Sequence, residues 1–231
     1  MTRSKNIGIV GITAEGASLC YRTIVSESSV YLGHYHHPEI FLHNPSFHTI
    51  LEAQKEKDWY EVARIVSLSI DKLTSIGAEV IVIPANSVHY AITEITAASP
   101  IPVLNMIELV AAECNKKNFK KVAILGVGIT MSDGLYVQPL KNVGIEPILP
   151  TDEDQTIINT IIYEEIVPGK VTAHSIEIIV SILEKLKKQG CDGVILGCTE
   201  LPIVITDSNS PLPFIDTTRL LAQKALEFSL S

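Results

Sequence analysis

The sequence predicts an α/β protein made of two similar lobes, each with a parallel β-sheet flanked by helices. Short runs of β-branched residues alternate with segments of helical periodicity along the chain, which favours parallel sheets with right-handed crossovers. Pairs of residues in the first half, such as Gly11 and Tyr21, recur at the same spacing in the second half, as Gly126 and Tyr136. Hydrophobic residues make up 46% of the 231 positions, which is enough for a proper core.

The expected elements follow in order along the chain. Apolar runs rich in β-branched residues predict strands at residues 6–10, 40–42, 80–83, 101–104, 121–125, 194–197 and 212–215. Helical periodicity predicts helices through residues 21–25 and over about 58–76, 108–116, 176–186 and 217–228. The segment that follows residues 40–42 is rich in Pro, Ser and His as far as His48, and we expect it to be a loop.

The two halves carry matching landmarks. Ten positions separate Gly11 from Tyr21 and Gly126 from Tyr136, and eight separate Gly77 from Ala85 and Gly190 from Cys198. Doubly wound folds in general repeat strand and helix, but the matching offsets at these landmarks favour an internal duplication. We expect one lobe from residues 1–105 with 208–231 and the other from 106–207. Because ligands bind at the carboxyl ends of parallel strands, the active site is expected in the cleft between the lobes.

Composition excludes several classes of function. The net charge is -8 and only 19% of the residues are charged, so the basic footprint of a nucleic-acid-binding protein is missing. Neither a signal peptide nor an apolar run of roughly 18 to 20 residues is present, so we expect a cytoplasmic protein that does not bind membranes. The cysteines and histidines have no metal-ligand spacing, and free thiols without a bound metal are expected.

The segment 194–202 carries the strongest chemical signal. Its apolar run ends at Gly197-Cys198-Thr199, which predicts a buried strand with a thiol at its carboxyl end. A single cysteine after an apolar run is usually core filler. The stretch from Gly197 to Pro202, however, resembles the second catalytic motif of the aspartate/glutamate racemase superfamily, whose enzymes need no cofactor.

Three further segments support this resemblance, which covers nearly the whole chain. They are residues 8–11 with Tyr21 and Arg22, the loop Asn86-Ser87-Val88-His89, and Leu125-Gly126 through Thr130 and Tyr136. The resemblance implies two pseudo-symmetric Rossmann-like lobes and an isomerase of amino-acid metabolism that racemises aspartate or glutamate. Its partner would be a small amino acid or dicarboxylate, and the family resemblance suggests a homodimer.

In that superfamily, two cysteines flank the α-carbon of the substrate. Racemisation needs an acid and a base on opposite faces of a planar carbanion, within about 3 to 3.5 Å of reacting distance. Cysteine is suitable because its pKa of about 8.5 can be shifted toward neutrality. Where the first cysteine would stand, this sequence has Ala85, which cannot transfer a proton. On the side of the substrate where Ala85 stands, the proton would have to be transferred by Ser87, His89, a residue of the 13–15 loop or a bound water.

The resemblance also implies the residues that bind substrate. Side chains and backbone N–H groups at helix starts would hold the substrate carboxylate. The residues that would do so are Asn86, Ser87, Thr130 and Thr199. Thr13 and Ala85 would lie nearby. Each polar residue among them is equally a favoured helix N-cap. Glu200 is either a solvated first-turn residue or an acidic neighbour that tunes Cys198 or meets the substrate ammonium. For His89, a hydrogen-bonded core histidine is favoured over a catalytic one.

Three functions remain open at this point. The first is an amino-acid racemase that uses Cys198 as acid and base at the α-carbon. The second is a decarboxylase or isomerase of the same superfamily that protonates an enolate-like intermediate from one cysteine, which needs no second thiol. The third is a non-catalytic protein that binds an amino acid or dicarboxylate.

Overall fold

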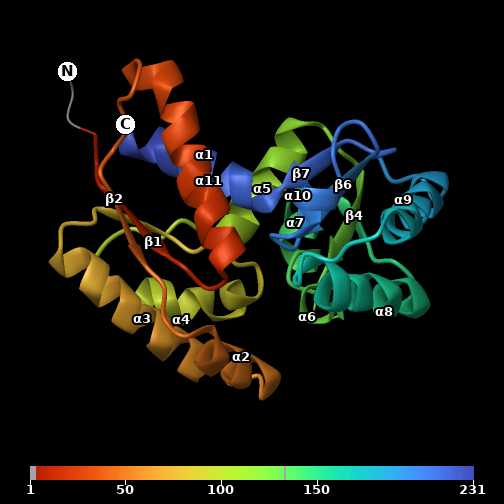
Figure 1. Ribbon diagram of the computed structural model, residues 1–231, viewed down its shortest axis with the longest axis horizontal. Helices are drawn as coiled ribbons and strands as arrows, with labels where there is room; N and C mark the ends of the chain where they lie inside the picture. Colours follow the sequence, from red (N-terminus) through yellow and green to blue (C-terminus); the bar gives the residue numbers. More distant parts are fainter. Residues whose placement is uncertain (1–3, 133) are drawn as a thin grey trace. The chain divides into compact units, whose positions relative to one another are not determined.

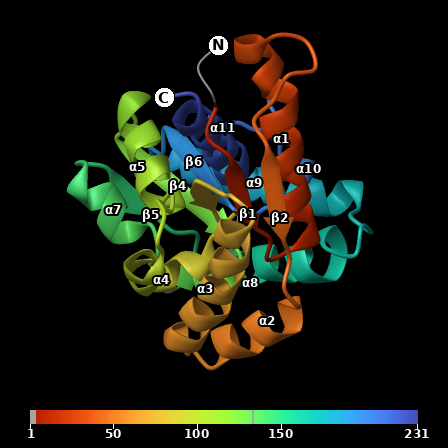
Figure 2. The same cartoon turned by 90° about the vertical axis from the view of Figure 1, so that its left-hand side faces the viewer.

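The computed structural model describes residues 4–132 and 134–231, and it contains two parallel sheets flanked by helices (Figures 1 and 2). The chain divides into two compact units, Met1–Leu109 with Thr218–Ser231, and Val110–Thr217. The sequence set the boundaries after residues 105 and 207 instead. Residues 208–217 group with the second unit because β7 (Phe214–Asp216) pairs with β6 (Gly193–Gly197).

The sheet of the first unit has the strand order β2-β1-β3, and all its strands are parallel. Its strands are β1 (Ile7–Val10), β2 (Ile40–His43) and β3 (Val80–Val82). A further parallel bridge joins Ile81 to Val103, so the chain runs beside β3 near residue 103. Gly8 is favoured in β1 because a Cβ there would lie only 2.9 Å from the Cβ of Ala78, which cannot rotate away.

Helices pack on both faces of this sheet. The helices of this part of the chain are α1 (Ala14–Leu32), α2 (Phe47–Lys55), α3 (Trp59–Ser75), the 3-10 helix η1 (Ser87–Ala91), α4 (Ile92–Ala98) and α11 (Thr217–Ser229). Helix α5 (Met106–Lys116) begins in the first unit and continues past Leu109 into the second. Figure 1 shows α1 and α3 on opposite sides of β1. One continuous apolar cluster joins alternate strand residues such as Val10 and Ile81 to α2, α3 and α4.

The second unit repeats this strand order. Its sheet runs β5-β4-β6-β7, with β4 at Lys121–Gly126 and β5 at Glu146–Ile148, and all pairs are parallel. The central strand therefore comes first in sequence in both units, and its two neighbours follow in the same order. This agreement confirms the pseudo-symmetric α/β fold that was expected from the repeated landmarks.

The helices of the second unit are α6 (Gly128–Ser132), α7 (Val137–Asn142), α8 (Asp152–Ile161), the π-helix η2 (Ile162–Ile166), α9 (Ala173–Lys188) and α10 (Leu201–Val204). Two of them, α8 and α9, begin at threonine caps. Thr151 caps α8 by accepting a hydrogen bond from Asp154 N at 3.2 Å, and Thr172 caps α9 in the same way. One apolar cluster joins β4 and β6 to α8, η2 and α9.

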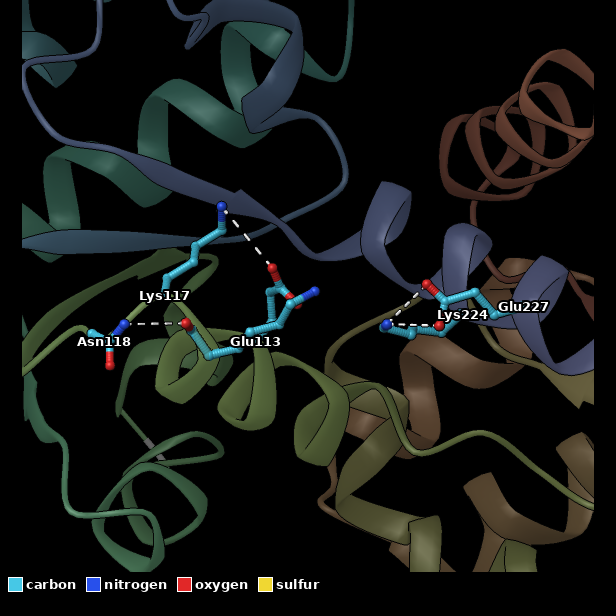
Figure 3. A network of polar contacts seen from close by, with 6 residues as sticks. Glu113, Lys117, Asn118, Lys224 and Glu227 are labelled. Carbon is cyan, nitrogen blue, oxygen red and sulfur yellow. Dashed lines mark hydrogen bonds and ion pairs between the residues drawn. The ribbon is translucent and has the colours of Figure 1, made fainter. Parts of the chain in front are cut away.

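Ion pairs join side chains on neighbouring turns of several helices. Glu113 on α5 lies 4.0 Å from Lys117, and Lys224 on α11 lies 2.7 Å from Glu227 (Figure 3). Ion pairs near the surface stabilise a fold by roughly 0 to 1 kcal/mol each, so the buried apolar clusters are the larger stabilising contribution. Across the described residues, every helix is too short or too polar to span a membrane.

Candidate functional site

Cys198 stands at the carboxyl end of the central strand pair of the second unit. It follows β6 directly, every residue of which is buried, and its own exposed fraction is only 7%. Gly197 lies opposite Gly126, the last residue of β4. A Cβ on Gly126 would approach the Gly197 carbonyl oxygen to 2.8 Å, so two glycines are needed where these strands end. The chain then turns into α10, which begins after Glu200.

The thiol of Cys198 is paired with a carboxylate. Its Sγ donates a hydrogen bond to Oε2 of Glu200 over 3.0 Å, and the Thr199 hydroxyl donates to the same oxygen over 2.6 Å. Glu200 is buried, so it is not the solvated first-turn residue that was one of its two interpretations. Burial raises the pKa of the Cys198 thiol well above its usual value, and the charge and hydrogen bond of Glu200 raise it further. At neutral pH, Cys198 is therefore a thiol that can donate a proton.

Thr130 on α6 adds a buried hydroxyl beside the same strand ends. Its methyl carbon would lie 3.0 Å from a Cβ on Gly197 and 3.1 Å from one on Gly126. Only 1% of Thr130 is exposed, and its Oγ1 has no hydrogen-bond partner in the described structure. Buried polar groups are nearly always hydrogen-bonded, so an unpartnered hydroxyl at this position is available to a ligand.

In the first unit, the predicted anion loop follows β3 and leads into η1. Ala85 and Asn86 are buried and Ser87 is partly buried. The Asn86 side chain makes no capping hydrogen bond to η1. The Ser87 hydroxyl accepts a hydrogen bond from Nε2 of Gln54 over 3.0 Å. Sequence analysis missed Gln54, because it lies 33 positions before Ser87 in a segment that was expected to begin as a loop.

His89 and Thr13 have structural partners. Because the Met106 backbone N–H donates to Nε2 of His89 over 3.2 Å, the ring proton sits on Nδ1, which lies 2.9 Å from the Ala85 carbonyl oxygen. Burial lowers the pKa of His89 to about 4. This neutral ring with both nitrogens occupied matches the favoured interpretation of a core histidine. Thr13 is the N-cap of α1, where its hydroxyl accepts from Gly16 N over 3.2 Å.

The histidine-rich segment does not form a metal centre in the described part of the chain. No group of three or more His, Cys, Asp or Glu side chains there is placed to hold a metal ion. His37 contacts the Pro38 carbonyl oxygen over 2.8 Å, and His43 contacts Lys72 over 3.2 Å.

Comparison with known proteins identifies the family. The family model of Asp/Glu/hydantoin racemases matches residues 9–225, which is nearly the whole chain. This chain belongs to the Asp/Glu/hydantoin racemase family.

Three relatives of this racemase-family protein are informative. The broad specificity amino-acid racemase RacX of Bacillus subtilis is 27% identical over 78% of this chain and 77% of its own length. A crystal structure from Yersinia pestis, provisionally assigned as an Asp/Glu racemase, is 33% identical with a TM-score of 0.91, over 98% of this chain and 100% of that one. An aspartate racemase homologue from Pyrococcus horikoshii is 30% identical with a TM-score of 0.86 and the same coverage.

Proposed function

We propose that this protein is a cofactor-independent amino-acid racemase for aspartate or glutamate, with Cys198 as acid and base at the substrate α-carbon. The observation that carries the proposal is the buried hydrogen bond between the Cys198 thiol and the Glu200 carboxylate at the end of β6. Family membership supports the reaction class. Because the name of RacX describes broad specificity, a substrate panel should also include neutral amino acids.

The thiol–carboxylate pair can move a proton in both directions. In one direction the Cys198 S–H bond breaks, a C–H bond forms at the α-carbanion, and a proton held on Oε2 of Glu200 passes to the sulfur. In the other direction the sulfur takes the α-proton while its own proton passes to Oε2 of Glu200, along the existing 3.0 Å hydrogen bond. Glu200 thus prevents a second negative charge from developing beside its own, which is otherwise costly in a buried site.

The remaining roles follow the resemblance. We propose that Thr130 and Thr199 bind the substrate carboxylate, together with Asn86 and Ser87 of the first unit, and that Thr13 and Ala85 contribute only contacts. The unpartnered hydroxyl of Thr130 supports this assignment.

Ala85 stands in the place of the first catalytic cysteine in this proposal, so one face of the α-carbon lacks a thiol. His89 cannot replace that thiol as a donor at neutral pH, because its Nδ1 proton is held by the Ala85 carbonyl. A water or the Ser87 hydroxyl remains as the partner. We therefore expect α-proton exchange that is much faster for one enantiomer than for the other.

Deuterium incorporation at the α-carbon in heavy water tests the proposal. L- and D-aspartate and glutamate are incubated with the wild type, Cys198→Ala and the control Cys191→Ala, which removes another buried thiol of the same unit. Loss of a general acid–base group costs about 10²-fold or more in rate, so Cys198→Ala should be nearly silent and the control active. Ala85→Cys should equalise the rates of the two enantiomers. Exchange that persists without Cys198 would overturn the proposal.

A single-cysteine decarboxylase is the second candidate, and one observation favours it. The pKa of Cys198 is raised by burial and by Glu200, so the resting thiol is already the proton donor that an enolate-like intermediate needs. Release of carbon dioxide from a substituted malonate, without α-proton exchange of any amino acid, would decide for this reaction. Stoichiometric binding of an amino acid or dicarboxylate without either reaction would leave a non-catalytic binding protein.

The homodimer, which the resemblance suggests, and the cytoplasmic location, which the sequence pattern suggests, both stay predictions. Sedimentation equilibrium of the purified protein over a range of concentrations tests the dimer, and cell fractionation tests the location.

A further inference from the structure

We propose that Gln54 is a positioning residue, which fixes the Ser87 hydroxyl as a hydrogen-bond donor for the carboxylate of the substrate. The inference rests on the proposed function, in which Ser87 belongs to the anion-binding loop, and it adds a residue from α2 that no sequence motif contains. It depends on the contacts of two side chains within the first unit.

The direction of the contact between the two side chains is fixed by chemistry. Nε2 of Gln54 lies 3.0 Å from Oγ of Ser87, and an amide nitrogen can only donate. The Ser87 oxygen is therefore the acceptor, and its own proton must point elsewhere. No second partner of this hydroxyl is found among the described residues. The O–H group of Ser87 can therefore donate to an anionic ligand, because a carboxylate only accepts hydrogen bonds.

The end of α2 holds Gln54 in place. Lys57 adopts a positive φ of 54°, and its N–H donates to the Gln54 carbonyl over 3.1 Å. Asp58 N donates to the Ala53 carbonyl over 2.8 Å, which completes a Schellman closure of the helix. Asp58 then caps α3 by accepting from Glu61 N over 2.9 Å. The backbone at Gln54 is thus tied to the start of the next helix.

Burial supplies the remaining restraint. Gln54 is only 7% exposed, and its neighbours Ile50 and Ala53 belong to the apolar cluster of the first unit. A buried amide with one dominant orientation loses little rotamer freedom when a ligand binds, so the Ser87 donor is oriented in advance. A Gln54 amide with a purely structural role would be equally buried. A positioning role differs from a structural one only in that a substitution of Gln54 changes the affinity for the ligand.

Gln54→Glu separates these roles, because a carboxylate has no donor. The Ser87 hydroxyl would turn to donate to Glu at position 54 and would be withdrawn from the substrate. We expect KM for the exchanging amino acid to rise about 10-fold or more with kcat little changed, the signature of lost uniform binding. Gln138→Glu on α7 is the matched control, since Gln138 is exposed and also donates its amide to a side-chain oxygen, that of Asn142.

The added negative charge could itself repel an anionic ligand, so the substitution is repeated in a Ser87→Ala background. If Gln54 acts through the hydroxyl, Gln54→Glu raises KM strongly in the wild-type background and far less without Ser87. An equal rise in both backgrounds would mean that charge alone is responsible and would overturn the inference, as would no rise at all. Thermal unfolding of each variant confirms that the fold is intact.

A direct binding measurement keeps this inference distinct from the proposed function. Calorimetric titration with L- and D-glutamate and aspartate gives Kd for the same four variants without any need for turnover. If the wild type binds but does not exchange the α-proton, racemisation fails while the Kd comparison still decides the role of Gln54. If the wild type binds none of these amino acids, both the proposed function and this inference fail.

Discussion

Thr130→Val should make the protein more stable and less able to bind substrate. The Thr130 hydroxyl is buried and has no hydrogen-bond partner within the described structure, and valine replaces it with a methyl group of nearly the same shape. A buried, unsatisfied polar group costs about 1 to 3 kcal/mol. The substitution removes that cost and leaves the packing of the other methyl group against Gly126 and Gly197 unchanged.

The free energy of unfolding should therefore rise by about 1 to 3 kcal/mol. For a chain of this length, each kcal/mol corresponds to an increase of about 2 to 4 °C in the melting temperature. Urea titration gives the free energy, and the α-deuterium assay gives KM for the amino acid. We expect KM to rise in the same variant that gains stability, because the hydroxyl is held in place for the ligand.

Thr217→Val is the matched control. Thr217 is as buried as Thr130, but its hydroxyl donates to the Leu196 carbonyl over 3.1 Å. Removing a satisfied hydroxyl should lower the free energy of unfolding by about 0.5 to 1.5 kcal/mol. If Thr130→Val destabilises the protein as Thr217→Val does, the Thr130 hydroxyl has a partner and the reasoning is refuted.

Two further predictions concern ionisation. Because the pKa of His89 falls from 6.5 to about 4 on folding, the unfolded chain binds the extra proton, and up to about 3 kcal/mol of stability should be lost as the pH falls through this range. Urea titrations from about pH 4 to 7.5 measure this loss, and His89 resonances of the folded protein that titrate near 6.5 would contradict it. Glu200→Gln should lower the pKa of Cys198 relative to the wild type, because the charge that repels the thiolate is gone. The pH profile of thiol alkylation, corrected with Cys198→Ala, checks the shift, and an unchanged profile would leave burial as its sole cause.

The parallel sheets were predictable from sequence because their signal is local. A strand that is buried on both faces must be apolar at every position, and residues 193–197 are. The repeated spacing from Gly190 to Cys198 and from Gly77 to Ala85 likewise reflects a helix, a turn and a strand of fixed length. These patterns placed Cys198 directly after a buried strand, as the structure has it.

Other elements could not be predicted, because distant contacts stabilise them. Helix α2 buries few residues, among them Ile50 and Ala53, and is closed by the Schellman contacts at Lys57. Because this apolar stripe is short and the segment is rich in Pro, Ser and His residues, the sequence pattern did not predict a helix there. Strand β5 has only three residues and includes Pro147, which an edge strand tolerates because one side of it makes no ladder hydrogen bonds. Neither α8 nor η2 was among the expected helices.

The sequence by itself determined the α/β fold, its duplication and the position of one thiol at a strand end, since apolar periodicity and turn glycines act over a few residues. Only the tertiary structure decided the state of each polar group. It paired Cys198 with Glu200, occupied both nitrogens of His89 and brought Gln54 to Ser87. It also left the Thr130 hydroxyl without a hydrogen-bond partner among the residues that the structure describes. A pKa and a hydrogen-bond direction depend on burial and on atoms far along the chain, and those are fixed only when the elements pack together.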